Sequence, residues 1–158
     1  MKRLFYFRIT ILLLMGGIIS GCGVTDYRLS GKWRSNLGLT TEYNEKHAKL
    51  TEKQKSVFSQ IFGSMELTYL SPGKCEVFRP SNTIITGSKE IETNDSKKII
   101  DYKIIFNNKD VVVISYYDPI FGETVRTLNF VDEDTYWLYG GDSGFFDFNI
   151  REYFTREK

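Results

Sequence analysis

The chain has 158 residues, 21 basic and 20 acidic side chains, and 12 Phe, 10 Tyr and 2 Trp. This length is typical of one domain, and the near balance of charge argues against nucleic acid or a polybasic membrane contact as the main activity. The many aromatic residues favour a sheet-built core.

The chain begins with a positively charged segment and a short apolar run. Residues 1–8, "MKRLFYFR", contain three basic side chains and no acid, and in residues 9–19, "ITILLLMGGII", Thr10 is the only polar side chain. This pattern is typical of a secretory signal peptide. The apolar run is about half of the ~20 residues that a membrane-spanning helix needs, so an uncleaved membrane anchor is the less favoured alternative.

The apolar run ends in Ile19, Ser20, Gly21 and Cys22. An aliphatic residue, two small residues and a cysteine in this place resemble the lipobox of bacterial lipoprotein precursors. The resemblance implies that the Cys22 thiol takes a diacylglyceryl group and that the chain is cut before Cys22. Several acyl chains on one residue give stable anchoring. We therefore expect a cleaved signal peptide at 1–21, a lipid-anchored tether at 22–30 and one domain at 31–158.

The same resemblance implies a location in the cell envelope. In Gram-negative lipoproteins an Asp directly after the lipidated cysteine favours the inner membrane, and this chain has Gly23 there. We expect the outer membrane, facing the periplasm, in a Gram-negative host, and the outer face of the cell membrane in a Gram-positive host. Without residues 1–21 the chain keeps 18 basic and 20 acidic side chains, a formal charge of −2.

The next two segments predict a strand and a helix. Residues 31–43, "GKWRSNLGLTTEY", are expected to form the first strand, opening on Trp33. Thr51 and Gln54 have the spacing of a helix capping box, and Gly63 is a natural residue to end that helix. One helical face carries Val57, Phe58, Ile61 and Phe62. This is the one helix that the sequence predicts after cleavage.

The rest of the chain predicts strands separated by short turns. Apolar residues alternate with polar ones, as in the series Ile100, Tyr102, Ile104 and Phe106, and again in Phe146, Phe148 and Ile150. Short turns join sequential antiparallel neighbours. About eight such strands predict a mainly β fold, an antiparallel up-and-down barrel, with a β-sandwich as the alternative. The expected strands are 64–70, 75–80, 83–93, 98–106, 111–117, 123–131, 135–140 and 145–156.

A second resemblance supports the barrel. The segment "GKWRS" at 31–35 resembles the Gly-x-Trp of lipocalins and the related fatty-acid-binding proteins, and so does a helix that follows the first strand. In that group a late basic residue packs across the Trp, which implies that Arg151 or Arg156 makes a cation–π contact with Trp33 at the closed end of the barrel.

No catalytic signature follows Cys22. His47 is the single histidine, which is too few for a zinc site. A Ser-His-Asp enzyme would have to use this same His47, and the sequence has no Gly-x-Ser-x-Gly nucleophile turn. The segment 140–144, "GGDSG", is expected to be a loop. Once Cys22 carries lipid, Cys75 has no disulfide partner, and we expect it to be a small packing residue. We expect no enzyme activity, no cofactor and no metal.

Two binding functions remain open. The first is a monomeric binding protein that holds a small apolar or amphipathic ligand inside the barrel; an apolar cavity larger than about 300 Å³ would favour it. The second is a protein-binding lipoprotein, such as an inhibitor, an immunity factor or an assembly accessory factor. A filled barrel with an exposed aromatic patch would favour the second, and the candidate patch is Tyr116, Tyr117, Ile120 and Phe121.

Overall fold

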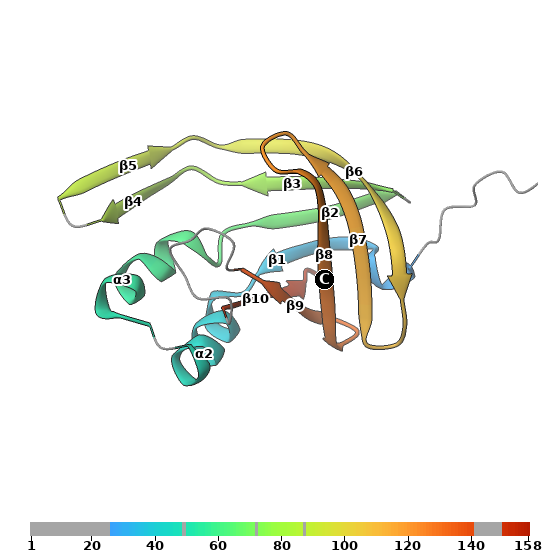
Figure 1. Ribbon diagram of the computed structural model, residues 1–158, viewed down its shortest axis with the longest axis horizontal. Helices are drawn as coiled ribbons and strands as arrows, with labels where there is room; N and C mark the ends of the chain where they lie inside the picture. Colours follow the sequence, from blue (N-terminus) through green and yellow to red (C-terminus); the bar gives the residue numbers. More distant parts are fainter. Residues whose placement is uncertain (1–25, 49, 72, 87, 141–149) are drawn as a thin grey trace, which may run out of the picture.

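The computed structural model describes residues 26–48, 50–71, 73–86, 88–140 and 150–158 (Figure 1). The expected signal peptide, Cys22, residues 141–144 of the expected loop, and Phe146 and Phe148 lie outside the described residues.

Eight antiparallel strands close into a barrel, so the predicted up-and-down barrel is confirmed and the sandwich is excluded. Going round the barrel, the order is β1, β10, β9, β8, β7, β6, β3 and β2, and β2 pairs with β1 to close it. The strands are β1 (Gly31–Ser35), β2 (Glu66–Ser71), β3 (Lys74–Arg79), β6 (Ser96–Asn107), β7 (Val111–Asp118), β8 (Gly122–Asp132), β9 (Thr135–Tyr139) and β10 (Arg151–Arg156).

A hairpin of two further strands, β4 (Asn82–Thr86) and β5 (Lys89–Thr93), projects from the barrel beyond β3 and β6 (Figure 1). The stretch 83–93 that the sequence predicts as one strand therefore folds back on itself. Pro80 stands between β3 and β4, where a residue without an N–H cannot continue a ladder.

Helix α3 (Glu52–Ile61) is the helix that the sequence predicts. Its capping box between Thr51 and Gln54 is formed, and Gly63 follows it with φ of +91°. A side chain at Gly63 would place its Cβ 2.6 Å from Cβ of Leu37, so this position requires glycine for space as well as for backbone angle.

The prediction of one strand over residues 31–43 was wrong in its second half. The first strand ends at Ser35, and helix α2 (Leu37–His47) follows it. The described residues thus contain two α-helices after β1, α2 and α3. The buried residues of α2 are Thr40 and Asn44, and both are polar. The helix therefore lacks the apolar periodicity from which a helix is predicted in a sequence.

Thr40 and Asn44 hold α2 against the start of β10. Strand β1 pairs with β10 only from Phe154 to Arg156. Before that point Thr40 Oγ1 accepts the Tyr153 N–H at 2.9 Å, and Asn44 Oδ1 accepts the Arg151 N–H at 3.0 Å. Asn44 Nδ2 also donates to the Arg151 carbonyl at 2.7 Å. The helix side chains thus satisfy strand groups that no neighbouring strand reaches.

Aromatic residues fill the half of the barrel that contains Trp33. Trp33, Tyr136 and Phe154 are fully buried, with ring centroids 4.7 Å apart for Trp33 and Tyr136 and 5.3 Å apart for Tyr136 and Phe154. Phe106 was expected to point inward, but it is 54% exposed because the pairing of β6 with β7 shifts register between Ile104 and Phe106.

One end of the barrel is closed by the turn η1 (Tyr27–Leu29), and we call this the closed end. Trp33 Nε1 donates to the Leu29 carbonyl at 3.1 Å, and the Arg156 guanidinium lies 4.3 Å from the Trp33 ring. Arg156 also donates to Asp134 Oδ1 at 2.9 Å. The predicted contact between Trp33 and a late arginine is therefore present, and Arg156 makes it.

Arg151, the other arginine considered for this contact, lies elsewhere. Its guanidinium stacks 3.7 Å from the Trp137 ring and 4.2 Å from the Tyr43 ring. Tyr43 comes from α2 and Trp137 from β9, so Arg151 helps to join the helix to the barrel wall.

Candidate functional site

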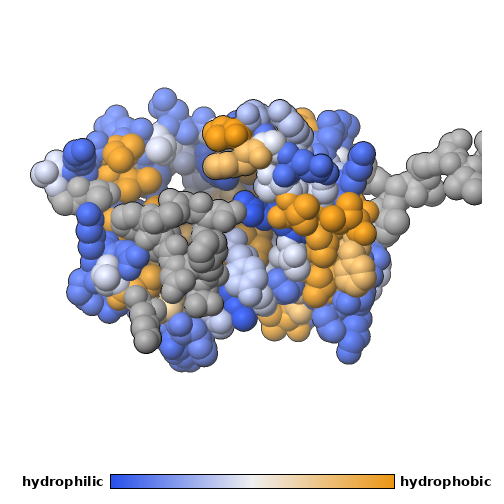
Figure 2. Space-filling view, in the orientation of Figure 1, coloured by the Kyte–Doolittle hydropathy of each residue, from blue (hydrophilic) through white to orange (hydrophobic). Residues whose placement is uncertain are grey.

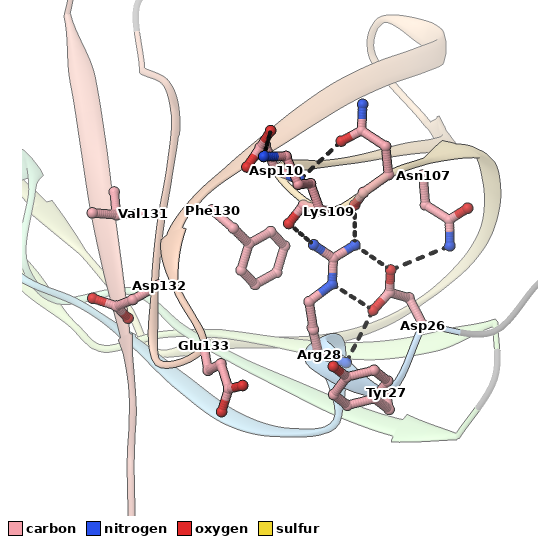
Figure 3. Close-up of a pocket in the computed structure, with 11 residues that line it drawn as sticks. Asp26, Tyr27, Arg28, Asn107, Lys109, Asp110, Phe130, Val131, Asp132 and Glu133 are labelled. Carbon is pink, nitrogen blue, oxygen red and sulfur yellow. Dashed lines mark hydrogen bonds and ion pairs between the residues drawn. The ribbon is translucent and has the colours of Figure 1, made fainter.

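A hollow of about 530 Å³ lies at the closed end (Figure 3). Arg28 occupies it and donates to both Asp26 carboxylate oxygens, at 2.9 and 2.6 Å, and to the carbonyls of Asn108 and Lys109, each at 2.7 Å. Its guanidinium also lies 4.6 Å from the Phe130 ring. The hydrogen bond from Arg28 lowers the pKa of Asp26. Because Arg28 fills the hollow and is already paired with Asp26, we do not take it as the ligand site.

A second cavity, of about 350 Å³, lies inside the barrel and reaches its opposite end, which we call the mouth. This volume is at the lower end of the range for small-molecule sites. Six strands supply its apolar walls, through Leu67, Val77, Ile100, Ile114, Leu128 and Leu138.

The mouth of this cavity is polar. Arg79 at the end of β3, Arg126 on β8 and Glu152 on β10 all line it. Each follows the inward alternation of its strand: Arg79 after Val77, Arg126 before Leu128, and Glu152 before Phe154. Two guanidinium groups and one carboxyl group therefore surround the entrance to an apolar interior.

Glu152 is only 6% exposed and ties three segments together at the mouth. Its Oε1 accepts the Ser35 hydroxyl at 2.6 Å, and Ser35 Oγ accepts the Gly63 N–H at 2.9 Å. Burial raises the pKa of Glu152 to about 7, against the opposing effects of the Ser35 hydrogen bond and the Arg79 charge. This carboxyl group changes its charge near neutral pH.

A groove of about 420 Å³ adjoins the cavity outside the barrel. It lies between α3, β4 and the barrel edge, and it shares Met65, Arg79 and Glu152 with the interior cavity. A ligand that enters the barrel can therefore place a polar group at Arg79 and Glu152 and extend beside α3.

The aromatic segment singled out in the sequence lies at the same mouth. Tyr116 lines the cavity, while Tyr117 and Ile120 are 71% and 83% exposed. Phe121 is 77% exposed and also lines the cavity rim. The interior cavity and the candidate patch singled out in the sequence thus meet at one end of the molecule.

The remaining candidates from the sequence lie away from the cavity or in its wall. His47 is exposed at the end of α2, stacked 4.4 Å from the Tyr43 ring. Cys75 is 2% exposed, and burial raises its pKa to about 12, so it packs as an unreactive thiol in the cavity wall. Within the described ranges, no group of three or more His, Cys, Asp and Glu side chains is placed to hold a metal ion.

Sequence reasoning missed Arg79, Arg126 and Glu152. The available signal was a charged residue at an inward position of an alternating strand, such as Arg126 two residues before Leu128. Charge at such a position is unusual in a filled barrel, because an unpaired buried charge is costly.

Comparison with known protein families, curated proteins and solved structures finds no match. In the part of the chain that the structure describes, no helix is long and apolar enough to span a bilayer.

Proposed function

We propose that this chain is a non-catalytic binding protein of the bacterial cell envelope, anchored by lipid on Cys22, that holds a small amphipathic ligand with an anionic group in its barrel. The observation that carries the proposal is the apolar interior cavity with Arg79 and Arg126 at its mouth. The lipocalin-like resemblance around Trp33 is consistent with this function, but it supports only the barrel fold and not the choice of ligand.

Each part of the cavity supports one part of the ligand. Apolar walls favour an apolar ligand body, at about 25 cal/mol per Å² removed from water. Guanidinium groups form strong charge-assisted hydrogen bonds with carboxylate, sulfonate or phosphate oxygens. Among the described residues that line the mouth, Arg79 and Arg126 are cationic and Glu152 is the one carboxyl group, and we expect this lining to favour an anionic ligand group.

Two fluorescent probes with the same aromatic body test this proposal. 1-Anilinonaphthalene-8-sulfonate carries a sulfonate, and N-phenyl-1-naphthylamine lacks it. We expect the anionic probe to bind more tightly, and we expect Arg126→Gln and Arg79→Gln to weaken its binding about 10-fold, since a hydrogen bond to a charged group contributes roughly 1.5–3 kcal/mol. Binding of the neutral probe should change little.

Arg34→Gln is the matched control, because Arg34 lies exposed on the outer wall of β1. If neither probe binds, or if the Arg126 and Arg79 variants weaken both probes equally, the proposed anion site is wrong. Mass spectrometry of an organic extract of the purified, processed protein then identifies the natural ligand.

The protein-binding alternative draws on one observation, the exposed loop of Tyr117, Ile120 and Phe121. Under that alternative, Ile120→Ser abolishes capture of a partner protein while the purified chain binds neither probe. Under the ligand-binding proposal, the purified chain binds the anionic probe without any partner.

A further inference from the structure

Each outward-facing residue pair of the β7–β8 hairpin contains one apolar or aromatic residue, from Val111 opposite Asn129 to Tyr117 opposite Glu123. Figure 2 shows an apolar area over β7 and β8. Val125 and Val131 are 50% and 61% exposed, and the 54% exposed Phe106 of β6 lies directly opposite Val113. We call this surface the β7–β8 flank; it consists of Phe106, Val111, Val113, Tyr117, Ile120, Phe121, Val125 and Val131.

One end of the flank lies where the chain leaves for Cys22. Asp26, the first described residue, accepts a hydrogen bond from Asn107 Nδ2 at 3.2 Å, and Arg28 holds the next residues of the β6–β7 turn. Cys22 stands four residues before Asp26. Four extended residues reach at most about 14 Å. An acylated Cys22 therefore keeps the β6–β7 end of the flank close to the bilayer.

We propose that the flank docks on the lipid bilayer, so that the anchored protein lies on its β7–β8 side. The proposal rests on the lipid attachment at Cys22 that is part of the proposed function. Apolar surface that is held at a membrane gains by entering the headgroup boundary, and it adds a second attachment to the acyl chains. The charged side chains on or beside the flank include Lys103, Lys109, Asp110, Asp118, Glu123 and Asp132, and they lie at headgroup level in this orientation.

This orientation brings the mouth of the barrel to the membrane. Phe121 belongs to the flank and also lines the cavity rim. Ile120 beside it is 83% exposed at the tip of the hairpin. An amphipathic ligand can then pass between the bilayer and the cavity along Phe121 without crossing bulk water. The chemical class of ligand is one that partitions into a lipid surface.

Nitroxide labels on the full, lipidated chain in phosphatidylethanolamine–phosphatidylglycerol vesicles test the orientation. The labels are placed through Val113→Cys and Ile120→Cys on the flank, and through Arg34→Cys as a control on β1, across the barrel from β7. Cys75 does not take label because it is 2% exposed and its pKa is about 12. Power saturation then compares collisions with oxygen, which concentrates in hydrocarbon, and with a water-soluble nickel complex.

We expect the labels at 113 and 120 to lose collisions with the nickel complex and gain collisions with oxygen, relative to the label at 34. Equal exposure of all three labels to the nickel complex, on protein that stays with the vesicles, overturns the docking and leaves the anchor intact. Protein that leaves the vesicles contradicts both the docking and the lipid anchor. Neither result affects the probe affinities measured in solution, which test the ligand site separately. Circular dichroism of each labelled variant verifies that its barrel is folded.

Discussion

At the scale of single residues, Glu152 is a carboxyl group that folding moves from water into the barrel wall. Its pKa rises from an ordinary 4.5 to about 7 through burial. Between these two values the folded chain keeps a proton that the unfolded chain releases, so stability falls as pH rises. Below 4.5 there is no effect, and above 7 the full cost is about 3 kcal/mol at 1.36 kcal/mol per pKa unit.

Glu152→Gln should remove this dependence, because an amide oxygen still accepts the Ser35 hydroxyl and carries no charge. We expect the variant to be more stable than the wild type by about 3 kcal/mol at pH 8 and nearly equal to it at pH 4.5. Denaturant unfolding at the two pH values measures the difference. Carboxylates with a lowered pKa, such as Asp26, contribute equally to the pH dependence of both proteins, so their effect cancels in the stability difference. An identical difference at both pH values would contradict the assignment.

Trp33 and Arg156 form the second prediction at this scale. Trp33→Ala removes a fully buried aromatic side chain and should cost about 3–5 kcal/mol. Because Arg156 lies 4.3 Å over that ring, Arg156→Ala should couple to Trp33→Ala by roughly 0.5–3 kcal/mol in a double-mutant cycle. Arg151→Ala is the matched control, since Arg151 stacks on Trp137, and its cycle with Trp33 should be additive. Denaturant melts of the single and double variants give these energies, and additivity of the Arg156 pair would rule out the contact.

The sequence predicts the residues of the closed end better than those of the mouth. The resemblance to the lipocalin Gly-x-Trp pattern predicts a contact between Trp33 and a late arginine, with Arg151 and Arg156 both open, and Arg156 makes it. Glu152 and Arg126 were not predicted, since alternation shows that a position faces inward only when its residue is apolar. A charged inward residue breaks the pattern that would reveal it.

At the scale of elements, we expect Asn44 to be the main residue that attaches α2 to the barrel. Its side chain accepts the Arg151 N–H and donates to the Arg151 carbonyl. Asn44→Ala leaves both backbone groups without these partners, and we expect a loss of about 3 kcal/mol, at 1–3 kcal/mol for each unsatisfied buried group. Glu45→Ala, at an exposed neighbouring position, should change stability by less than about 0.5 kcal/mol. Thermal unfolding compares the two variants, and equal losses would show that the Asn44 bridge is unimportant.

Elements with apolar periodicity or strong turn residues were predicted, and elements held by polar contacts were not. Helix α3 follows from its capping box and its apolar face. Helix α2 does not, because Thr40 and Asn44 are its buried residues. The sequence analysis predicts one strand where the β4–β5 hairpin lies. Gly87 and Ser88, between the two strands, are a pair typical of two-residue hairpin turns.

At the scale of the whole molecule, closure of the barrel follows from the short turns, since sequential strands with no second layer must cover their own apolar face. What the sequence does not fix is how much of the interior stays open. Aromatic residues fill the half near Trp33, while Leu, Ile and Val line the half near the mouth. The difference depends on which residue faces which across the barrel, and this follows from register rather than from composition.

The membrane anchor gives the last prediction, on Cys22. A serine hydroxyl is a much weaker nucleophile than the cysteine thiolate, so Cys22→Ser should lose incorporation of a radioactive fatty acid and should accumulate as precursor or as soluble protein. Cys75→Ser is the matched control and should keep the label, because Cys75 is buried inside the barrel. Equal label on the Cys22 variant and the wild type would show that the lipobox interpretation is wrong. Soluble Cys22→Ser protein should bind the anionic probe as tightly as the wild type, since the cavity lies at the end of the barrel opposite Asp26 and needs no lipid to form.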